Sequence, residues 1–350
     1  MATNTNTINV AILGASGYTG GELVRLLSHH PNVAITALTA ERNAGQSMGK
    51  VFPHLAHIAL PPLVKIADAN LDKVDAAFLA LPHGLTQEVA IALPKHLKLV
   101  DLSADFRLSD VATYAKWYGH EHKAPEMQKG AVYGITELKR DQIKKSSLIA
   151  NPGCYPTSAQ LPLVPLLEAK LIDADDIVID AKSGVTGAGR EAKEANLYAE
   201  VTEGIHAYGV GNHRHAPEIE QGLSEAAGKS ILVNFTPHLM PMSRGILSTI
   251  YVKLAKGATA NDLRETLKKR YAAEHFVKVL PEGATPATRH VRGSNFTHIA
   301  VFADRVPGRA IVISVLDNLV KGASGQAVQN FNVVFGLPEA TSLEQEALFP

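Results

Sequence analysis

Cysteine is almost absent from this chain, and neither sign of charge is in excess. The single cysteine, Cys154, excludes an internal disulfide and a cysteine-based zinc site. The formal net charge of zero argues against a surface that binds the phosphate backbone of nucleic acids. No apolar run approaches the length of a membrane span, and the opening MATNTNTINV lacks the basic start and apolar core of a signal peptide. We therefore expect a cytoplasmic enzyme that acts on a small molecule, with no nucleic-acid or membrane partner.

Short apolar runs alternate with helical patterns over the first 150 residues, which is typical of a parallel α/β domain. The runs INVAIL, AITALT, AAFLAL, LVDLSA and SLIAN predict buried strands. From about Asp175 the strand patterns lengthen and alternate between polar and apolar residues. That alternation predicts a mostly antiparallel sheet with one covered face, so the second region is of the α+β class. Helices are expected there over NDLRETLKKRYAAE and around VTEGIHAYG, and a last helix follows the final strand.

Cys154 lies within NPGCYPT, a pattern that predicts a strand, a tight turn and then a helix. Pro152 fixes one φ angle and Gly153 can adopt a left-handed one. Thr157 and Ser158 can bind the amides at the helix start. A thiol at a helix N-terminus is favoured as a thiolate, and the amides there can stabilise an oxyanion. A nucleophile is therefore predicted, although a lone cysteine is also often a small buried hydrophobe.

Three glycines, Gly14, Gly17 and Gly20, follow the first predicted strand with the spacing G-x-x-G-x-x-G. The usual dinucleotide fingerprint is G-x-G-x-x-G, whose glycines let the backbone approach a pyrophosphate at a helix N-terminus. A plain tight turn is the alternative. After the second strand, Glu41 suits a ribose hydroxyl and Arg42 suits a 2′-phosphate, so NADP is predicted over NAD unless Arg42 is only a solvated surface charge. The predicted cofactor contacts in this region are Gly14, Ala15, Ser16, Gly17, Tyr18, Thr19, Gly20 and Arg42.

Two histidines, His213 and His215, stand in VGNHRHAPEIEQ. In an extended chain before Pro217 their side chains share one face, and Arg214 points the other way. A histidine beside the thiol can take its proton and later return one to a leaving oxygen. Two alternatives stay open. One is a metal site, for which no third ligand is evident, and the other is a structural role with both rings hydrogen-bonded.

Two further loops follow predicted strands. AKSGVTGAGR contains Ser183 and Gly184, and it can close over a nicotinamide or a substrate phosphate or serve as an ordinary mobile connection. LVDLSADFRL places Asp105 and Arg107 where ligands of open α/β sheets tend to lie. Arg107 then suits a phosphate or carboxylate, and a structural pairing with Asp105 or a helix-capping role is the alternative.

Taken together and in this order, the motifs resemble the N-acetyl-γ-glutamyl-phosphate reductase family, which is related to aspartate-semialdehyde dehydrogenase. The motifs are GASGYTG, DLSADFR, NPGCYPT, KSGVTGAGR, HRHAPEI and KGASGQAVQN, and the resemblance runs from about residue 8 to residue 338. It implies an NADP-binding Rossmann domain over 1–153 and a catalytic and oligomerisation domain over 154–316. It also implies a C-terminal helix within 317–350 that returns to the first domain, and a homo-oligomer, dimer or tetramer.

The resemblance also implies a reaction in arginine biosynthesis. Cys154 attacks the acyl phosphate and forms a thioacyl intermediate, and NADPH reduces it to N-acetylglutamate 5-semialdehyde. His213 is the expected acid–base residue, with His215 as the alternative. Arg107, Ser183 and Glu218 are the expected substrate contacts. Further cofactor contacts are expected at Ser183, Gly184 and Asn318, and no metal is expected.

Three rival functions stand against this one, and the presence of all six motifs argues against the second of them, a non-catalytic regulator. The same chemistry can act on a related acyl phosphate, such as aspartyl or N-acetyl-aminoadipyl phosphate. A non-catalytic NADP-binding regulator would keep GASGYTG but would tolerate loss of Cys154. A redox sensor based on Cys154 has no second cysteine to resolve a sulfenic acid.

Overall fold

The computed structural model describes residues 7–349, and the chain divides into two compact units. The first unit contains the residues up to Pro152 together with Ala323–Glu344. The second contains Gly153–Gly322 and the residues from Gln345. The predicted domains change at 153 and 316, whereas the units change at 152 and 322. The roles assigned to the predicted domains stay a prediction.

The helix of the range 317–350 belongs to the first unit, whereas the last described residues of that range do not. The residues from Gln345 belong to the second unit. The backbone explains this division, because the N–H of Leu348 donates to the carbonyl of Arg292 at 2.8 Å.

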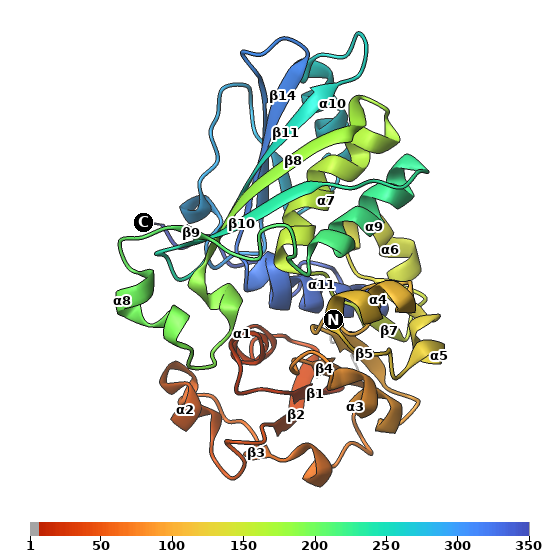
Figure 1. Ribbon diagram of the computed structural model, residues 1–350. Helices are drawn as coiled ribbons and strands as arrows, with labels where there is room; N and C mark the ends of the chain where they lie inside the picture. The colour runs from red at the N-terminus through yellow and green to blue at the C-terminus, as the bar shows by residue number, and fades with distance from the viewer. Residues whose placement is uncertain (1–6, 350) are drawn as a thin grey trace, which may run out of the picture. The chain divides into compact units, whose positions relative to one another are not determined.

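Within the described residues, the first unit has a seven-stranded parallel sheet in the order β3-β2-β1-β4-β5-β7-β6 (Figure 1). The strands are β1 (Ile8–Leu13), β2 (Val33–Thr39), β3 (Leu63–Val64), β4 (Ala76–Leu79), β5 (Lys98–Asp101), β6 (Ala131–Tyr133) and β7 (Leu148–Ala150). The five apolar runs predicted as strands form β1, β2, β4, β5 and β7. The strand order reverses beside β1, between β2 and β4, which is where doubly wound sheets bind nucleotides.

Helices of the first unit cover a sheet whose central strands are buried. They are α1 (Tyr18–Leu27), α2 (Met48–Val51), α3 (Thr86–Ala92), α4 (Val111–Tyr118), α5 (Pro125–Gln128), α6 (Thr136–Ile143) and α11 (Gly325–Val334). Val10–Leu13 of β1 are fully buried, as expected for a parallel strand with helices on both faces. The late helix α11 packs against α1, α6 and β5, so the end of the chain completes this unit.

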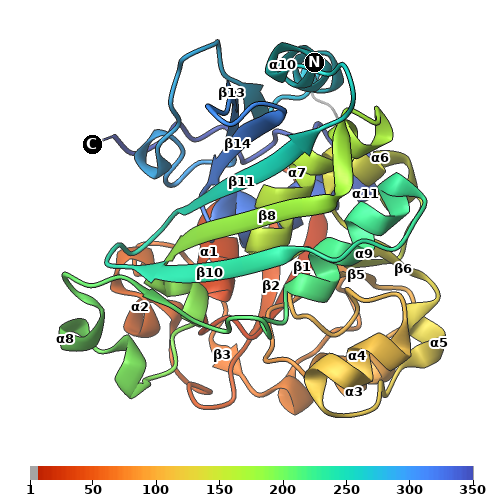
Figure 2. The same ribbon diagram turned by 45° about the horizontal axis from the view of Figure 1, so that its top comes forward.

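Within the described residues, the second unit has a seven-stranded mixed sheet in the order β12-β13-β14-β11-β8-β10-β9 (Figure 2). Four of its neighbouring pairs are antiparallel, and the pairs β12–β13 and β8–β10 are parallel. The mostly antiparallel sheet predicted from the sequence is therefore confirmed. Its strands are β8 (Ile172–Gly184), β9 (His206–Ala207), β10 (Asn234–Met240), β11 (Ile246–Leu254), β12 (Val277–Val279), β13 (Thr297–Ala303) and β14 (Arg309–Leu316).

Three helices of the second unit pack together with its sheet. The helix α7 (Cys154–Glu168) lies against β8, β11 and β14 and contacts α9 (Ala216–Ala227) and α10 (Ala260–Tyr271). Buried and half-exposed residues alternate along β11, which confirms the prediction of one covered face. Among residues 7–349, no helix is both long and apolar enough to cross a membrane.

The helix expected around VTEGIHAYG is present only as the short α8 (Tyr198–Val201), which ends at the first residue of that segment. The rest of the segment is not helical, and His206 pairs with Leu239 at the edge of the sheet. Left-handed backbone at Glu203 and Gly209 explains the break, because a right-handed helix cannot continue through such residues. A helix forms instead at α9, where Pro217 occupies the first turn, a position that suits proline.

Candidate functional site

Cys154 is the first residue of α7, so the predicted strand, turn and helix are present. The turn does not use a left-handed glycine, because Gly153 has φ −69° and ψ 155°. The predicted side-chain caps are also wrong. The hydroxyl of Thr157 donates to the carbonyl of Gly153 and that of Ser158 donates to the carbonyl of Tyr155, each at 3.1 Å. Neither hydroxyl is an acceptor for the amides at the helix start in these bonds.

A carboxylate from another helix holds the start of α7. The N–H of Gly153 donates to Oε1 of Glu218 at 2.7 Å, and Glu218 is 1% exposed in the first turn of α9. The side-chain amide of Gln160 donates to the carbonyl of Glu218 at 3.1 Å. These two bonds fasten the first two turns of α7 to the first turn of α9. Glu218, predicted as a substrate contact, therefore has a positioning role at the turn that carries Cys154.

The two histidines lie in a turn that enters α9, and the predicted extended chain is wrong. His215 is the N-cap residue, with φ −82° and ψ −14°, and its N–H donates to Nδ1 of His213 at 3.1 Å. Their ring centroids are 4.8 Å apart, so the rings are neighbours despite the turn. His215 precedes Glu218 by three residues, which is one helical turn. The bond from Glu218 to Gly153 therefore brings the His215 turn next to the Cys154 turn.

Aromatic side chains surround His213. Its ring centroid lies 5.8 Å from Tyr155, 5.3 Å from Tyr208 and 5.4 Å from Phe235. Burial lowers the pKa of His213 to about 4, and the nearby positive charge of Arg214 contributes to the decrease. The ring is therefore neutral at neutral pH. Because its Nδ1 accepts a hydrogen bond, the neutral ring carries its proton on Nε2.

Tyr155 connects this aromatic cluster with the end of β8. The hydroxyl of Tyr208 donates to the hydroxyl of Tyr155 at 3.1 Å. Burial raises the pKa of Tyr155 well above its ordinary value, Tyr208 adds to the increase, and a hydrogen bond with Ser183 opposes it. Ser183 is 1% exposed at the end of β8, and its hydroxyl also donates to the carbonyl of Gly184 at 3.0 Å.

The loop after β14 runs against Cys154. A Cβ atom on Gly322 would lie 2.7 Å from Cβ of Cys154, so this position needs glycine. The side chain of Asn318 accepts from the N–H of Gly245 at 2.8 Å and donates to the hydroxyl of Thr186 at 2.9 Å. Asn318, predicted as a cofactor contact, thus connects the loop after β14 with the glycine-rich loop after β8.

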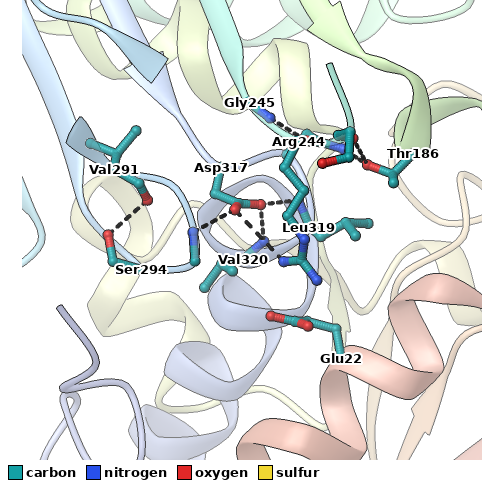
Figure 3. Close-up of polar contacts among 12 residues, drawn as sticks. Glu22, Thr186, Arg244, Gly245, Val291, Ser294, Asp317, Leu319 and Val320 are labelled. Carbon is teal, nitrogen blue, oxygen red and sulfur yellow. Dashed lines mark hydrogen bonds and ion pairs between the residues drawn. The ribbon is translucent and has the colours of Figure 1, made fainter. Parts of the chain in front are cut away.

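A buried carboxylate fixes the same loop (Figure 3). Asp317 accepts from the N–H groups of Gly293 (2.7 Å), Leu319 (2.8 Å) and Val320 (3.2 Å). The guanidinium of Arg244 lies 3.7 Å from the same carboxylate. These contacts hold the residues on both sides of Asn318 in one conformation.

In the first unit, DLSADFR has a structural role. The carboxylate of Asp105 accepts from the N–H of Gly84 (2.8 Å) and the N–H of Thr86 (3.0 Å) at the start of α3, and from the hydroxyl of Tyr114 (2.9 Å). The helix-capping alternative for Asp105 is therefore confirmed.

Arg107, predicted to bind the substrate phosphate, is 7% exposed. Its Nε donates to the carbonyl of Asn151 at 2.8 Å and its Nη2 to the carbonyl of Leu102 at 2.9 Å. Asn151 is three residues before Cys154 in the sequence. Arg107 thus holds the segment that leads into the turn of Cys154.

The glycine loop between β1 and α1 has the close backbone approach that its sequence predicts. Gly14 has φ +91°, and a Cβ atom there would lie 2.2 Å from the carbonyl oxygen of Ala80. A Cβ atom on Gly20 would lie 2.5 Å from the carbonyl oxygen of Gly14. Gly17 is the N-cap residue of α1. The other predicted contacts, Ala15, Ser16, Tyr18 and Thr19, lie in the same loop and the first turn of α1.

Glu41 and Arg42 are both exposed in the turn that follows β2, yet they differ in their contacts. Oε1 of Glu41 accepts from the N–H of Ile66 at 3.2 Å. Glu41 therefore has a structural contact with a neighbouring segment. The side chain of Arg42 is presented to solvent at the end of the strand next to β1.

The contacts thus join Cys154, His213, His215, Glu218 and Ser183 in the second unit, while the glycine loop, Arg42 and Arg107 belong to the first. Sequence reasoning missed three aromatic residues of the second unit, namely Tyr155, Tyr208 and Phe235. The one available signal was that Tyr155 directly follows the cysteine. Within residues 7–349, no group of three or more His, Cys, Asp or Glu side chains is arranged to hold a metal ion.

Two family models match most of the chain. Residues 9–146 match the NAD binding domain of semialdehyde dehydrogenase, and residues 154–318 match the semialdehyde dehydrogenase dimerisation domain. Among curated relatives, N-acetyl-gamma-glutamyl-phosphate reductase from Rhodospirillum rubrum is 61% identical over 348 residues, covering 98% of this chain and 99% of the relative. A probable chloroplastic N-acetyl-gamma-glutamyl-phosphate reductase from Oryza sativa subsp. japonica is 61% identical over 343 residues, covering 98% of this chain and 83% of the relative.

Solved structures of lower identity share the fold. Aspartate semialdehyde dehydrogenase II complexed with ASA from Vibrio cholerae has a TM-score of 0.73 at 18% identity, covering 95% of this chain and 99% of that one. Aspartate semialdehyde dehydrogenase with NADP from Candida albicans has a TM-score of 0.70 at 16% identity, covering 94% and 99%. At these identities the likeness concerns the fold alone.

Proposed function

As this chain belongs to the N-acetyl-γ-glutamyl-phosphate reductases of the semialdehyde dehydrogenase family, we propose that it reduces N-acetyl-γ-glutamyl phosphate with NADPH. The products are N-acetylglutamate 5-semialdehyde and phosphate, and the step belongs to arginine biosynthesis. The observation that carries the proposal for the site is the bond from Gly153 to Glu218. It fastens the turn of the only cysteine to the turn of the two histidines.

Cys154 is the proposed nucleophile. Its thiolate forms a carbon–sulfur bond with the acyl carbon, the bond from that carbon to the phosphate oxygen breaks, and phosphate leaves. The helix start supports this step, because its backbone N–H groups and the helix dipole favour negative charge on the thiolate and on the oxyanion. When the hemithioacetal later collapses, its hydroxyl gives its proton to the acid–base histidine, the carbon–sulfur bond breaks and Cys154 returns as a thiolate.

The glycine loop fits a dinucleotide, because Gly14 and Gly20 leave no room for a Cβ atom where the backbone approaches its neighbours. We propose that the residues from Gly14 to Gly20 hold the pyrophosphate and that Arg42 holds the 2′-phosphate. The structural contact of Glu41 with Ile66 supports the preference for NADP over NAD. Bound NADPH supplies the hydride that reduces the thioester.

The contacts of the histidines support His215 as the acid–base residue in place of the predicted His213. His213 has a lowered pKa, and its Nδ1 already accepts the N–H of His215. Its remaining nitrogen carries a proton, so the ring is a poor proton acceptor at neutral pH. We propose that His215 takes the thiol proton and returns a proton to the hemithioacetal oxygen, and that His213 orients the turn.

The substrate contacts remain proposals. Ser183 is proposed to bind the phosphate of the substrate, since it lies beside Tyr155, the neighbour of the nucleophile. Glu218 is proposed to position the turn of Cys154, and Arg107 the segment that precedes it.

The remaining expectations also stay proposals. Gly184 and Asn318 are proposed cofactor contacts, because they lie in the loops after β8 and β14, which the bond from Asn318 to Thr186 connects. The match to a dimerisation domain supports a homo-oligomer, and the cytoplasm stays the predicted compartment.

The reverse reaction tests this proposal directly. Purified protein is supplied with N-acetylglutamate 5-semialdehyde, phosphate and NADP, and the absorbance of NADPH is followed over time. Turnover should require phosphate and should be faster with NADP than with NAD. Aspartate semialdehyde is the matched alternative substrate. A higher kcat/KM for aspartate semialdehyde would contradict the proposed substrate and would favour the rival acyl phosphate.

A further inference from the structure

Tyr155, the residue that follows the nucleophile, touches several parts of the second unit at once. Its side chain is 2% exposed. Its ring centroid lies 5.8 Å from His213, 5.8 Å from His215 and 5.3 Å from Phe235 on β10. Because one ring contacts both histidines, a change in its position would move both histidines relative to Cys154.

Two phenol hydroxyls fix the position of that ring. Tyr208 donates to the hydroxyl of Tyr155 at 3.1 Å, and Tyr155 donates to the carbonyl of His238 on β10 at 3.4 Å. Tyr208 is itself anchored, because its N–H donates to the carbonyl of Pro237 at 3.1 Å. Its ring also lies 5.3 Å from His213. The hydroxyl pair thus links the start of α7, the segment that carries the histidines, and β10.

We propose that Tyr155 and Tyr208 are positioning residues, whose paired hydroxyls hold the acid–base histidine in reach of the Cys154 thiol. This inference rests on the proposed function, because it assigns the pair a part in activating the nucleophile. The pair acts through the histidines and through neither substrate nor cofactor.

The protonation of the two phenols is compatible with this role. Burial raises the pKa of Tyr208 to about 12 and raises that of Tyr155 further above its ordinary range. Both phenols therefore keep their protons at neutral pH. The bond between them is therefore a neutral hydrogen bond at neutral pH.

The test uses Tyr208→Phe, Tyr155→Phe and the double variant, with Tyr271→Phe as the matched control. Tyr271 is 3% exposed, and its hydroxyl donates to the carbonyl of Leu161 on α7, so its loss also removes a buried hydrogen bond to the same helix. Three quantities are measured for each variant. They are the rate of Cys154 alkylation by iodoacetamide as a function of pH, the kcat and KM of the reductase, and the melting temperature.

Tyr208→Phe should slow alkylation at neutral pH and lower kcat by about three- to tenfold, the range expected for one net hydrogen bond, with KM unchanged. Its alkylation profile should move toward that of an ordinary thiol. The double variant should be no slower than the slower single variant, because both substitutions remove the same bond. Tyr271→Phe should lower the melting temperature and leave alkylation unchanged.

Two results would overturn the inference. In one, Tyr208→Phe lowers the melting temperature as Tyr271→Phe does but leaves alkylation and kcat unchanged, so the pair is only structural. In the other, KM rises while kcat stays constant, so the hydroxyls contact the substrate. If the wild-type chain reduces no acyl phosphate, the proposed function alone fails, because alkylation reports on the thiol without any substrate.

Discussion

The helices α1 and α7 both begin after a strand and a glycine, yet different forces fix the two turns. At α1, the left-handed Gly14 and the tight contact of Gly20 with its carbonyl set the loop within a short stretch of sequence. At α7, Gly153 has an ordinary φ angle, and Glu218, 65 positions later, accepts its N–H. The glycine loop before α1 can therefore be predicted from local sequence. The turn of Cys154 cannot be predicted in the same way, because its conformation depends on Glu218, which is distant in the sequence.

The largest expected effect comes from Cys154→Ser, which removes the chemistry at the start of α7 and leaves α1 intact. We expect kcat to fall by about 10⁴-fold or more, because a serine hydroxyl at neutral pH is a much weaker nucleophile than a thiolate. The Kd of NADPH and the circular dichroism spectrum should not change. Steady-state turnover and a fluorescence titration measure the two quantities. A serine variant within about tenfold of the wild-type rate would contradict the nucleophile.

The second prediction separates the two histidines beside that turn. His215→Asn should lower kcat by about 10²–10⁴-fold and flatten the pH–rate profile, since it removes the proposed acid–base group. His213→Asn should cost only a few-fold, because its ring is neutral and its Nδ1 only orients the turn. The readout is the pH dependence of kcat for both variants. If the two phenotypes are exchanged, His213 is the acid–base residue, as the sequence analysis first predicted.

These two turns also show which parts of the structure could be predicted from the sequence. The strands β1, β2, β4, β5 and β7 were predictable because both faces of a parallel sheet are covered, which leaves continuous apolar runs. The nucleophile turn was predictable as a type of turn, from Pro152, Gly153 and Cys154. Its partners were not, because a hydrogen bond between residues 65 or 53 positions apart leaves no periodic signal.

The errors have equally specific causes. Pro217 was interpreted as the end of an extended segment, but proline is also favoured in the first turn of a helix, and the chain uses it there. As a result, an extended chain was predicted for His213 and His215, which in fact lie in a turn. The segment VTEGIHAYG has residues compatible with a helix, yet its left-handed positions at Glu203 and Gly209 end any helix.

A third prediction concerns the glycine loop before α1, whose conformation is set by nearby residues. Gly14→Ala should raise the Kd of NADPH by about a hundredfold, because its Cβ atom would collide with the carbonyl oxygen of Ala80 in a left-handed backbone. Gly130→Ala is the matched control, since it lies in the same unit outside the glycine loop and its Cβ atom would lie at an ordinary 3.7 Å from the nearest carbonyl oxygen. Fluorescence titration with NADPH compares them. Equal losses in both variants would show that the close approach at Gly14 is not what the cofactor needs.

A fourth prediction concerns the contact between Gly153 and the distant Glu218. Glu218→Ala leaves the N–H of Gly153 without its acceptor, and we expect a loss of about 1–3 kcal/mol in the free energy of unfolding and about a tenfold lower kcat. Glu218→Gln keeps an acceptor oxygen and should recover most of both. Denaturant melts and turnover assays supply the values. If Gln is as damaging as Ala and KM rises instead, the charge of Glu218 binds the substrate, as the sequence analysis expected.

The smallest effect is expected from the substitution of Arg42, which tests the preference for NADPH over NADH. Arg42→Ala should raise the KM for NADPH by about tenfold, the loss of one charge-assisted contact, and should leave the KM for NADH unchanged. The two reduced cofactors are compared in the forward direction, with N-acetyl-γ-glutamyl phosphate as the substrate. A parallel loss with NADPH and NADH would mean that Arg42 only supports its loop.

The helix α11 also bears on the order in which the chain can fold as it is synthesised. Its Asn330 donates to the carbonyl of Gly134 at 2.8 Å and accepts from the hydroxyl of Thr136 at 2.7 Å. The first unit is therefore completed by residues that are translated nearly last. The second unit runs almost without interruption from Gly153 to Gly322. On the ribosome, the unit that contains Cys154 can therefore be nearly complete while the first unit still lacks its final helix. The unit that begins second in the chain can thus be the first to have nearly all of its residues.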